Sequence, residues 1–218
     1  MDQQTIIRKT EEMVRDQLLG EGSGHDWYHI ERVTNTAKQL AEKENANLFI
    51  VTLAALLHDL ADDKVVESEE QGLLAIKEWL EQHEVSADDS EHIVTIIQNM
   101  SFKGGNGIAL QTMEGQVVQD ADRLDAIGAI GIARCFVYSG KKGRPIYDPT
   151  LDVREQMTKE EYRTGSSSAI HHFYEKLLKL KDLMNTNAGY QLAVERHQFM
   201  EQFLDMFYQE VGMDKKTE

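Results

Sequence analysis

The hydrophobic residues of this chain recur every three or four positions, which is the period of an amphipathic α-helix. In one such segment, His29, Val33, Thr36 and Leu40 follow one another at spacings of four, three and four residues. No stretch shows the sustained alternation that is typical of a half-buried strand. The pattern therefore predicts an all-α protein.

The same pattern predicts where the helices lie. The segment at about 46–60 is apolar on nearly every side, so we expect it to be a central, covered helix. Neither an internal repeat nor a linker indicates a second domain, and we expect one domain over residues 1–218. The predicted helices are a first segment ending before the glycine-rich stretch 20–24, then about 25–44, 46–60, 67–83, 87–100 and 114–138, and a C-terminal helical extension at about 158–184 and 188–211.

Composition and charge narrow the class of protein. The net charge of −15 disfavours nucleic acid and anionic membranes as partners, and an anionic substrate would need local cations. Cys135 is the only cysteine, which excludes an internal disulfide and fits a reducing compartment. The longest apolar run, LFIVTLAALL, is about half of the ~20 residues that a membrane span needs. We therefore expect a cytoplasmic protein without a membrane span.

The segment AALLHDLADD, residues 54–63, ends a very apolar run on His58 and Asp59. On a helix, adjacent side chains point about 100° apart, so these two residues can reach one ion beside the helix. A helix end that reaches water is the alternative interpretation. A metal site requires further ligands elsewhere in the chain.

His29 and Asp122 are candidates for those ligands. A single histidine on an apolar helix face, such as His29, is usually a satisfied core side chain. Asp122 heads a stripe of small residues, Ala126, Ala129 and Ala133, where burying an acid is costly unless a cation meets it. Two imidazoles with two carboxylates suit a divalent ion of the Mn, Fe or Mg type. Eight histidines and 38 acids nevertheless allow many chance combinations.

Three segments, HDWYHIERV, ALLHDLADDK and QDADRLDAIG, resemble in this order the signature segments of the HD-domain metal-dependent phosphohydrolases. The pattern of that superfamily is H…HD…D on a helical core, and the resemblance spans about residues 25–135. It implies that residues 1–218 form a single HD-type domain. The resemblance implies that His29, His58, Asp59 and Asp122 bind one divalent metal ion.

Three further segments, SFKGG, YSGKKGRPIYDP and HHFYEKLLKLKDLM, resemble the bacterial YpgQ/YedJ-type subgroup. This resemblance implies a manganese-dependent nucleotide pyrophosphohydrolase, which cleaves (d)NTP to (d)NMP and pyrophosphate. Mn²⁺ is the favoured ion, with Mg²⁺, Fe²⁺, Co²⁺ and Ni²⁺ as alternatives, and the expected partner is a small nucleotide. A phosphatase of nucleoside monophosphates or alarmones, and a non-catalytic nucleotide-binding regulator, are the alternative functions. The oligomeric state is not predicted.

Other residues are predicted to act on the substrate. Asp62, three residues after Asp59, has the offset of the acid that accepts a proton from water in related HD nucleotidases. His25 lies one turn before His29 and is predicted to contact phosphate or to protonate the leaving group. The competing interpretation of Asp62 is a solvated acid in a charged run, and that of His25 is a histidine at the start of a helix. The predicted substrate-binding residues are Lys64, Lys103, Asp125, Lys141, Lys142 and Arg144.

Overall fold

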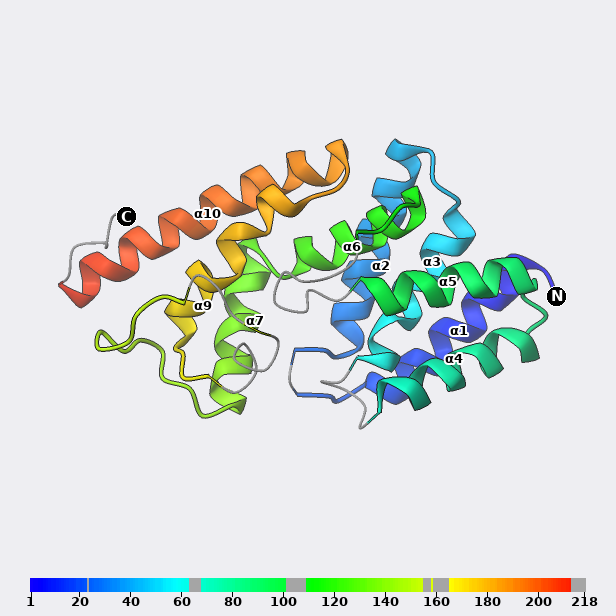
Figure 1. Cartoon of the computed structure of the whole chain (residues 1–218), viewed down its shortest axis with the longest axis horizontal. Coiled ribbons are helices and arrows are strands. Elements are labelled where there is room, and N and C mark those ends of the chain that lie inside the picture. Colours follow the sequence, from blue (N-terminus) through cyan, green and yellow to red (C-terminus); the bar gives the residue numbers. More distant parts are fainter. Residues whose placement is uncertain (23, 63–67, 101–108, 155–157, 159–164, 213–218) are drawn as a thin grey trace. The chain divides into compact units, whose positions relative to one another are not determined.

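The computed structural model describes residues 1–22, 24–62, 68–100, 109–154, 158 and 165–212 (Figure 1). Helices are the regular elements of these residues, and none of them belongs to a strand, so the all-α prediction is confirmed. No helix within these ranges is long and apolar enough to cross a membrane. The chain divides into two compact units, Met1–Asp122 and Arg123–Glu218. The single-domain organisation stays a prediction.

The first unit is built around α3. This helix contacts α1, α2 and α5 (Figure 1), and its residues from Phe49 to Leu57 are all buried. The predicted central, covered helix is thus confirmed. The helices of this unit are α1 (Gln3–Leu18), α2 (Trp27–Glu44), α3 (Leu48–Leu57), the 3₁₀-helix η1 (His58–Ala61), α4 (Glu69–Gln82), α5 (Ala87–Asn99) and most of α6 (Met113–Asp125).

The end of α3 differs from the sequence prediction. The helix does not run on to about residue 60, because the chain tightens after Leu57 into η1. The N–H of Asp62 donates to the carbonyl oxygen of Asp59 at 3.2 Å and closes this turn. A 3₁₀ turn is narrower than an α-helical turn. As a result, His58 and Asp59 lie on a separate tight turn instead of on the face of a regular helix.

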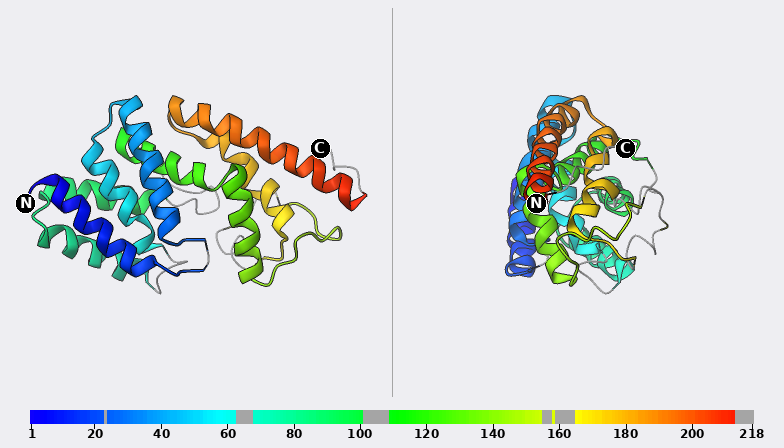
Figure 2. Two further views of the ribbon diagram at one scale, coloured as in Figure 1. Left: turned by 180° about the vertical axis from the view of Figure 1, so that it is seen from behind. Right: turned by 90° about the vertical axis from the view of Figure 1, so that its left-hand side faces the viewer.

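The second unit is a smaller group of helices. Its α7 contacts α9 and α10 (green, yellow and orange to red in Figure 2), and the rings of Phe136, Phe173 and Phe203 pack against one another between these helices. The guanidinium group of Arg123 donates to the carbonyl oxygen of Leu183. The elements of this unit are α7 (Gly128–Lys141), α9 (Ala169–Glu175), η3 (Leu177–Lys179), η4 (Lys181–Leu183) and α10 (Asn187–Val211).

The predicted helix at 114–138 is in fact two helices, α6 and α7. Gly128 has a φ of +74°, which L side chains rarely adopt, so an α-helix cannot run through this position. Gly131 then approaches the preceding backbone closely, because a Cβ there would lie 2.2 Å from the carbonyl oxygen of Ala126. The predicted stripe of alanines on one helix face is therefore wrong, and Ala129 and Ala133 are exposed.

The predicted helix at 158–184 is also shorter in the structure. In this region α9 covers only Ala169–Glu175, and two 3₁₀-helices follow it. Lys176 leaves the helical conformation with φ −139° and ψ −58°, so the pattern of leucines continues through turns. Leu177 and Leu180 are buried but Leu183 is exposed, so apolar periodicity predicted the buried face only in part and did not predict the interruption.

His172 on α9 gives the second unit a predicted acid sensitivity. Burial, together with the positive charges of Lys176, Arg144 and Arg154, lowers the pKa of His172 from 6.5 to about 3. Below pH 6.5 the unfolded chain takes up a proton that the folded chain does not accept until about pH 3, so stability is lost as the pH falls through this window. We expect wild type to lose about 2 kcal/mol more than His172→Gln between pH 7.5 and pH 5. Urea unfolding of both proteins at these pH values measures the difference, and parallel pH profiles would contradict it.

Candidate metal centre

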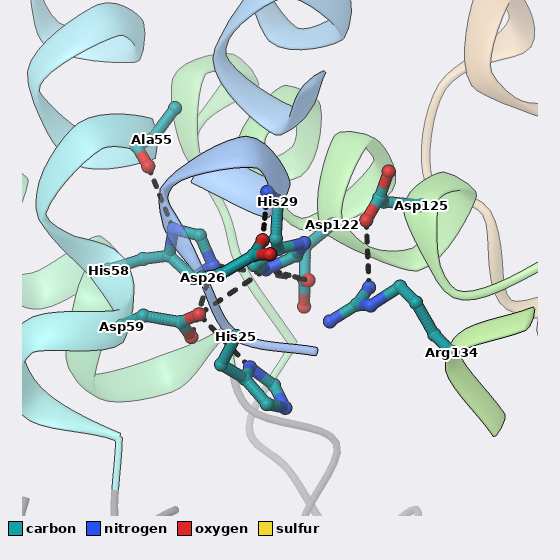
Figure 3. A network of polar contacts seen from close by, with 9 residues as sticks. All are labelled: His25, Asp26, His29, Ala55, His58, Asp59, Asp122, Asp125 and Arg134. Carbon is teal, nitrogen blue, oxygen red and sulfur yellow. Dashed lines mark hydrogen bonds and ion pairs between the residues drawn. The ribbon is translucent and has the colours of Figure 1, made fainter. Parts of the chain in front are cut away.

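The start of α2 holds His29 in place. Asp26 is the N-cap residue, and its Oδ1 accepts a hydrogen bond from the backbone N–H of His29 at 2.9 Å. This contact satisfies one of the free N–H groups at the helix start and fixes the first turn. The side chain of His29 is completely buried and points toward the η1 turn (Figure 3).

The tautomer of His58 follows from its hydrogen bond. Its Nδ1 lies 2.7 Å from the carbonyl oxygen of Ala55, and because a carbonyl oxygen can only accept, Nδ1 carries the proton. In the neutral ring, Nε2 therefore presents a lone pair. This atom is buried and forms no hydrogen bond within the described part of the chain. It lies 3.3 Å from Oδ1 of Asp59 and 4.0 Å from Oδ1 of Asp122.

The four predicted metal ligands come together in the first unit (Figure 3). Nε2 of His29 lies 3.3 Å from Oδ2 of Asp59 and 3.6 Å from Oδ1 of Asp122. One ligand atom from each of His29, His58 and Asp122 lies within 4.8 Å of the other two. A lone pair of an imidazole facing carboxylate oxygens is unfavourable unless a proton or a cation lies between them. The cluster can therefore hold a divalent metal ion.

His25 lies beside this cluster, just before α2. Its Nδ1 is 3.0 Å from Oδ2 of Asp59, and its side chain is 14% exposed. His25, His29 and Asp59 form a second group whose ligand atoms lie within 4.8 Å of one another. Asp59 is thus in contact with the three histidines His25, His29 and His58.

Two opposing effects act on the charge of Asp59. Burial would raise its pKa, but the imidazoles of His58, His25 and His29 outweigh burial and hold the pKa well below its ordinary value. Asp59 is therefore ionised throughout the neutral range. A carboxylate in this state is ready to bind a cation.

The other residues predicted near the metal have different surroundings. Asp62 follows η1 and is half-buried, and its backbone N–H contacts Asp59. Asp125 is buried and forms an ion pair of 2.8 Å with Arg134, so its carboxylate is engaged by a cation. Lys64 and Lys103 lie outside the described residues.

The predicted phosphate-binding cations Lys141, Lys142 and Arg144 belong to the second unit, at the C-terminal end of α7. Lys141 and Lys142 are exposed, and Nζ of Lys142 lies 5.7 Å from the ring centroid of Tyr138. The backbone N–H of Arg144 donates to the carbonyl oxygen of Ser139 at 2.9 Å. Their contact with a substrate stays a prediction.

His83 and His92, two further histidines of the first unit, are occupied by local contacts. The ring of His83 stacks on Trp79 with centroids 4.0 Å apart, and its Nδ1 contacts the carbonyl oxygen of the same residue at 2.8 Å. Nε2 of His92 lies 2.9 Å from Oγ1 of Thr112. Neither histidine belongs to a group of potential ligands in the part of the chain that the structure describes.

Three supporting residues were not predicted from the sequence. Asp26 has a readable signal, since an aspartate directly before an apolar helical segment is a typical N-cap. The carbonyl oxygen of Ala55 carries no signal, because every residue has one. Arg134 pairs with Asp125 across the break between α6 and α7, and helical spacing cannot predict a contact across such a break.

Comparison with known proteins identifies relatives of this chain. The family model of the HD domain matches residues 26–127. YpgQ of Bacillus subtilis is 41% identical over 207 residues, which cover 94% of this chain and 93% of YpgQ. Three solved structures are also similar. A protein from Lactobacillus plantarum has a TM-score of 0.87 and 44% identity, covering 96% of this chain and 98% of its own.

The second structure is an HD-superfamily hydrolase from Bacillus thuringiensis, with a TM-score of 0.77 and 48% identity. The match covers 98% of this chain and all of that one. YpgQ has itself been solved in complex with ADP, and that structure has a TM-score of 0.76 and 39% identity over 94% of this chain and 97% of YpgQ. The histidine–aspartate cluster lies within the matched HD segment apart from His25, which directly precedes it. From its sequence, its fold and these relatives, the chain belongs to the HD-domain superfamily.

Proposed function

We propose that this protein is a metal-dependent nucleotide pyrophosphohydrolase that hydrolyses (d)NTP to (d)NMP and pyrophosphate, with Mn²⁺ as the favoured ion. The observation that carries the metal site is the buried Nε2 of His58, which presents a lone pair toward the carboxylates of Asp59 and Asp122. With His29, these residues offer two nitrogens and two carboxylates. Such mixed ligands favour Mn²⁺ or Fe²⁺ over Ca²⁺, which prefers oxygen alone.

When bound, a divalent ion neutralises charge on phosphate oxygens and lowers the pKa of a water molecule. The chain supplies the groups that handle protons. The hydrogen bond of His25 to Asp59 places a proton on its Nδ1 and leaves Nε2 to contact phosphate or to hold the proton for the leaving group. Asp62, at the end of the same turn as Asp59, is the proposed acceptor of the proton from water.

The nucleotide part of the proposal is supported by the relatives. YpgQ binds ADP in its solved complex, and it matches this chain over nearly its full length. In a protein with a net charge of −15, the triphosphate needs positive charge from the metal and from side chains. Lys141, Lys142 and Arg144, with Lys64 and Lys103, are the proposed sources, and Asp125 is a proposed substrate contact.

The experiment that tests this function is a substrate panel with product identification. We expect the Mn²⁺-loaded protein to release pyrophosphate from (d)NTPs and to leave (d)NMPs intact. Chelation should stop the reaction, and Mn²⁺ should restore it. Release of orthophosphate from nucleoside monophosphates, or hydrolysis of alarmones alone, would contradict the proposed substrate and identify one of these compounds as the substrate instead. Tight nucleotide binding without turnover would indicate a regulator.

A further inference from the structure

Gly72 on α4 lies against the turn that carries His58 and Asp59. The helix α4 packs on η1, and Gly72 is buried in this contact. A Cβ atom at this position would lie 2.5 Å from the carbonyl oxygen of Leu60 and 2.8 Å from Cα of Ala61. Both atoms belong to the backbone of η1, so no change of a side-chain rotamer can make room for it.

Helix propensity does not explain this glycine. Glycine is a poor helix former, and alanine would be favoured in the first turns of α4 if nothing stood in the way. The close approach of η1 is the feature that requires it. The backbone atoms that a Cβ would strike come directly after Asp59, within the same four-residue 3₁₀ turn.

Movement of this turn would affect the metal ligands first. His58 is tied to α3 through the carbonyl oxygen of Ala55, whereas Asp59 is held between the histidines and the end of η1. If α4 pushes on Leu60 and Ala61, the strain falls on the backbone that aims the Asp59 carboxylate. Metal–ligand distances tolerate only a few tenths of an ångström.

We propose that Gly72 is a positioning residue of the metal centre, because it lets α4 press against η1 and thereby sets the orientation of Asp59. The proposal rests on the metal site under the proposed function. It assigns to α4, which contributes none of the proposed ligands, a part in the affinity for the ion.

The test is the variant Gly72→Ala, with Mn²⁺ binding measured by the electron paramagnetic resonance signal of the free ion. We expect binding to weaken about 10-fold or more, the range in which residues that support metal ligands act. Leu80→Ala is the matched control on the same helix. It removes atoms from a fully buried side chain and adds none against η1, so it should destabilise α4 while Mn²⁺ binding stays within about two-fold of wild type.

A double variant, Gly72→Ala with Ala61→Gly, covers the case in which the single variant does not fold. It removes the Ala61 Cβ, which lies 3.3 Å from the added carbon, but keeps the contact with the Leu60 carbonyl oxygen. Weakened binding is therefore expected again. Wild-type affinity in either Gly72 variant would overturn the inference, as would an equal loss in Leu80→Ala. A wild-type protein that binds no divalent ion would instead overturn the proposed function.

Discussion

Replacing Asp59 by Asn is expected to abolish Mn²⁺ retention and turnover while the helical fold remains. Asp59 is buried, and its carboxylate contacts all three of His25, His29 and His58. An amide keeps the shape and loses the charge that a cation needs. We expect Mn²⁺ affinity to fall roughly 100-fold or more, because even residues that only support ligands cost about 10- to 100-fold. Mn²⁺ binding, product release and circular dichroism measure the three parts of this prediction.

Two further variants test whether the loss is specific to the proposed metal ligands. His58→Ala should have the same effect, because it removes the imidazole nitrogen that faces both carboxylates. Asp16→Asn, on the exposed side of α1, is the matched control and should behave as wild type. Full activity of Asp59→Asn or His58→Ala after chelation and renewed addition of Mn²⁺ would refute the metal site.

Divalent metal is expected to stabilise the first unit strongly. The cluster exists only in the folded chain, so an ion that binds it stabilises the folded state by mass action. At a free Mn²⁺ concentration about 1,000 times the Kd, the free energy of unfolding should rise by about 4 kcal/mol. Both tryptophans, Trp27 and Trp79, lie in the first unit, so tryptophan fluorescence reports its unfolding separately from the second unit.

Chelation and variants identify the source of this stabilisation. EDTA should return the unfolding curve to that of the metal-free protein, and His58→Ala should show no Mn²⁺-dependent increase. Ca²⁺ should stabilise less than Mn²⁺, because two of the proposed ligands are imidazoles. An equal increase in wild type and His58→Ala would place the ion elsewhere and contradict the proposed centre.

The sequence predicted the helical class and the covered position of α3 because apolar periodicity records burial directly. It was less successful where helices are interrupted. Gly128 breaks the predicted helix at 114–138, and Lys176 ends α9 early, although the apolar pattern continues in both places. Periodicity registers which side of a segment is buried, but a single residue with an unusual backbone conformation leaves almost no trace in it.

The candidate site, too, was predictable from the sequence only in part. His29, His58, Asp59 and Asp122 could be selected from the sequence through the order of their motifs, and the structure brings all four together in the first unit. The tautomer of His58, the hydrogen bond between His25 and Asp59, and the pairing of Asp125 with Arg134 were not predictable. Each depends on a distance between atoms that are separated along the chain or on a backbone carbonyl that every residue possesses.

The sequence by itself thus determined the helical architecture and the chemical types available to a metal: two imidazoles and two carboxylates, without a thiolate. Tertiary structure decided that these groups converge, that Asp59 is ionised among three histidines, and that α4 approaches η1 closely enough to require a glycine. The reason is physical. Residue type sets what a side chain can bind, whereas orientation, burial and pKa arise only from neighbours that folding brings within a few ångströms.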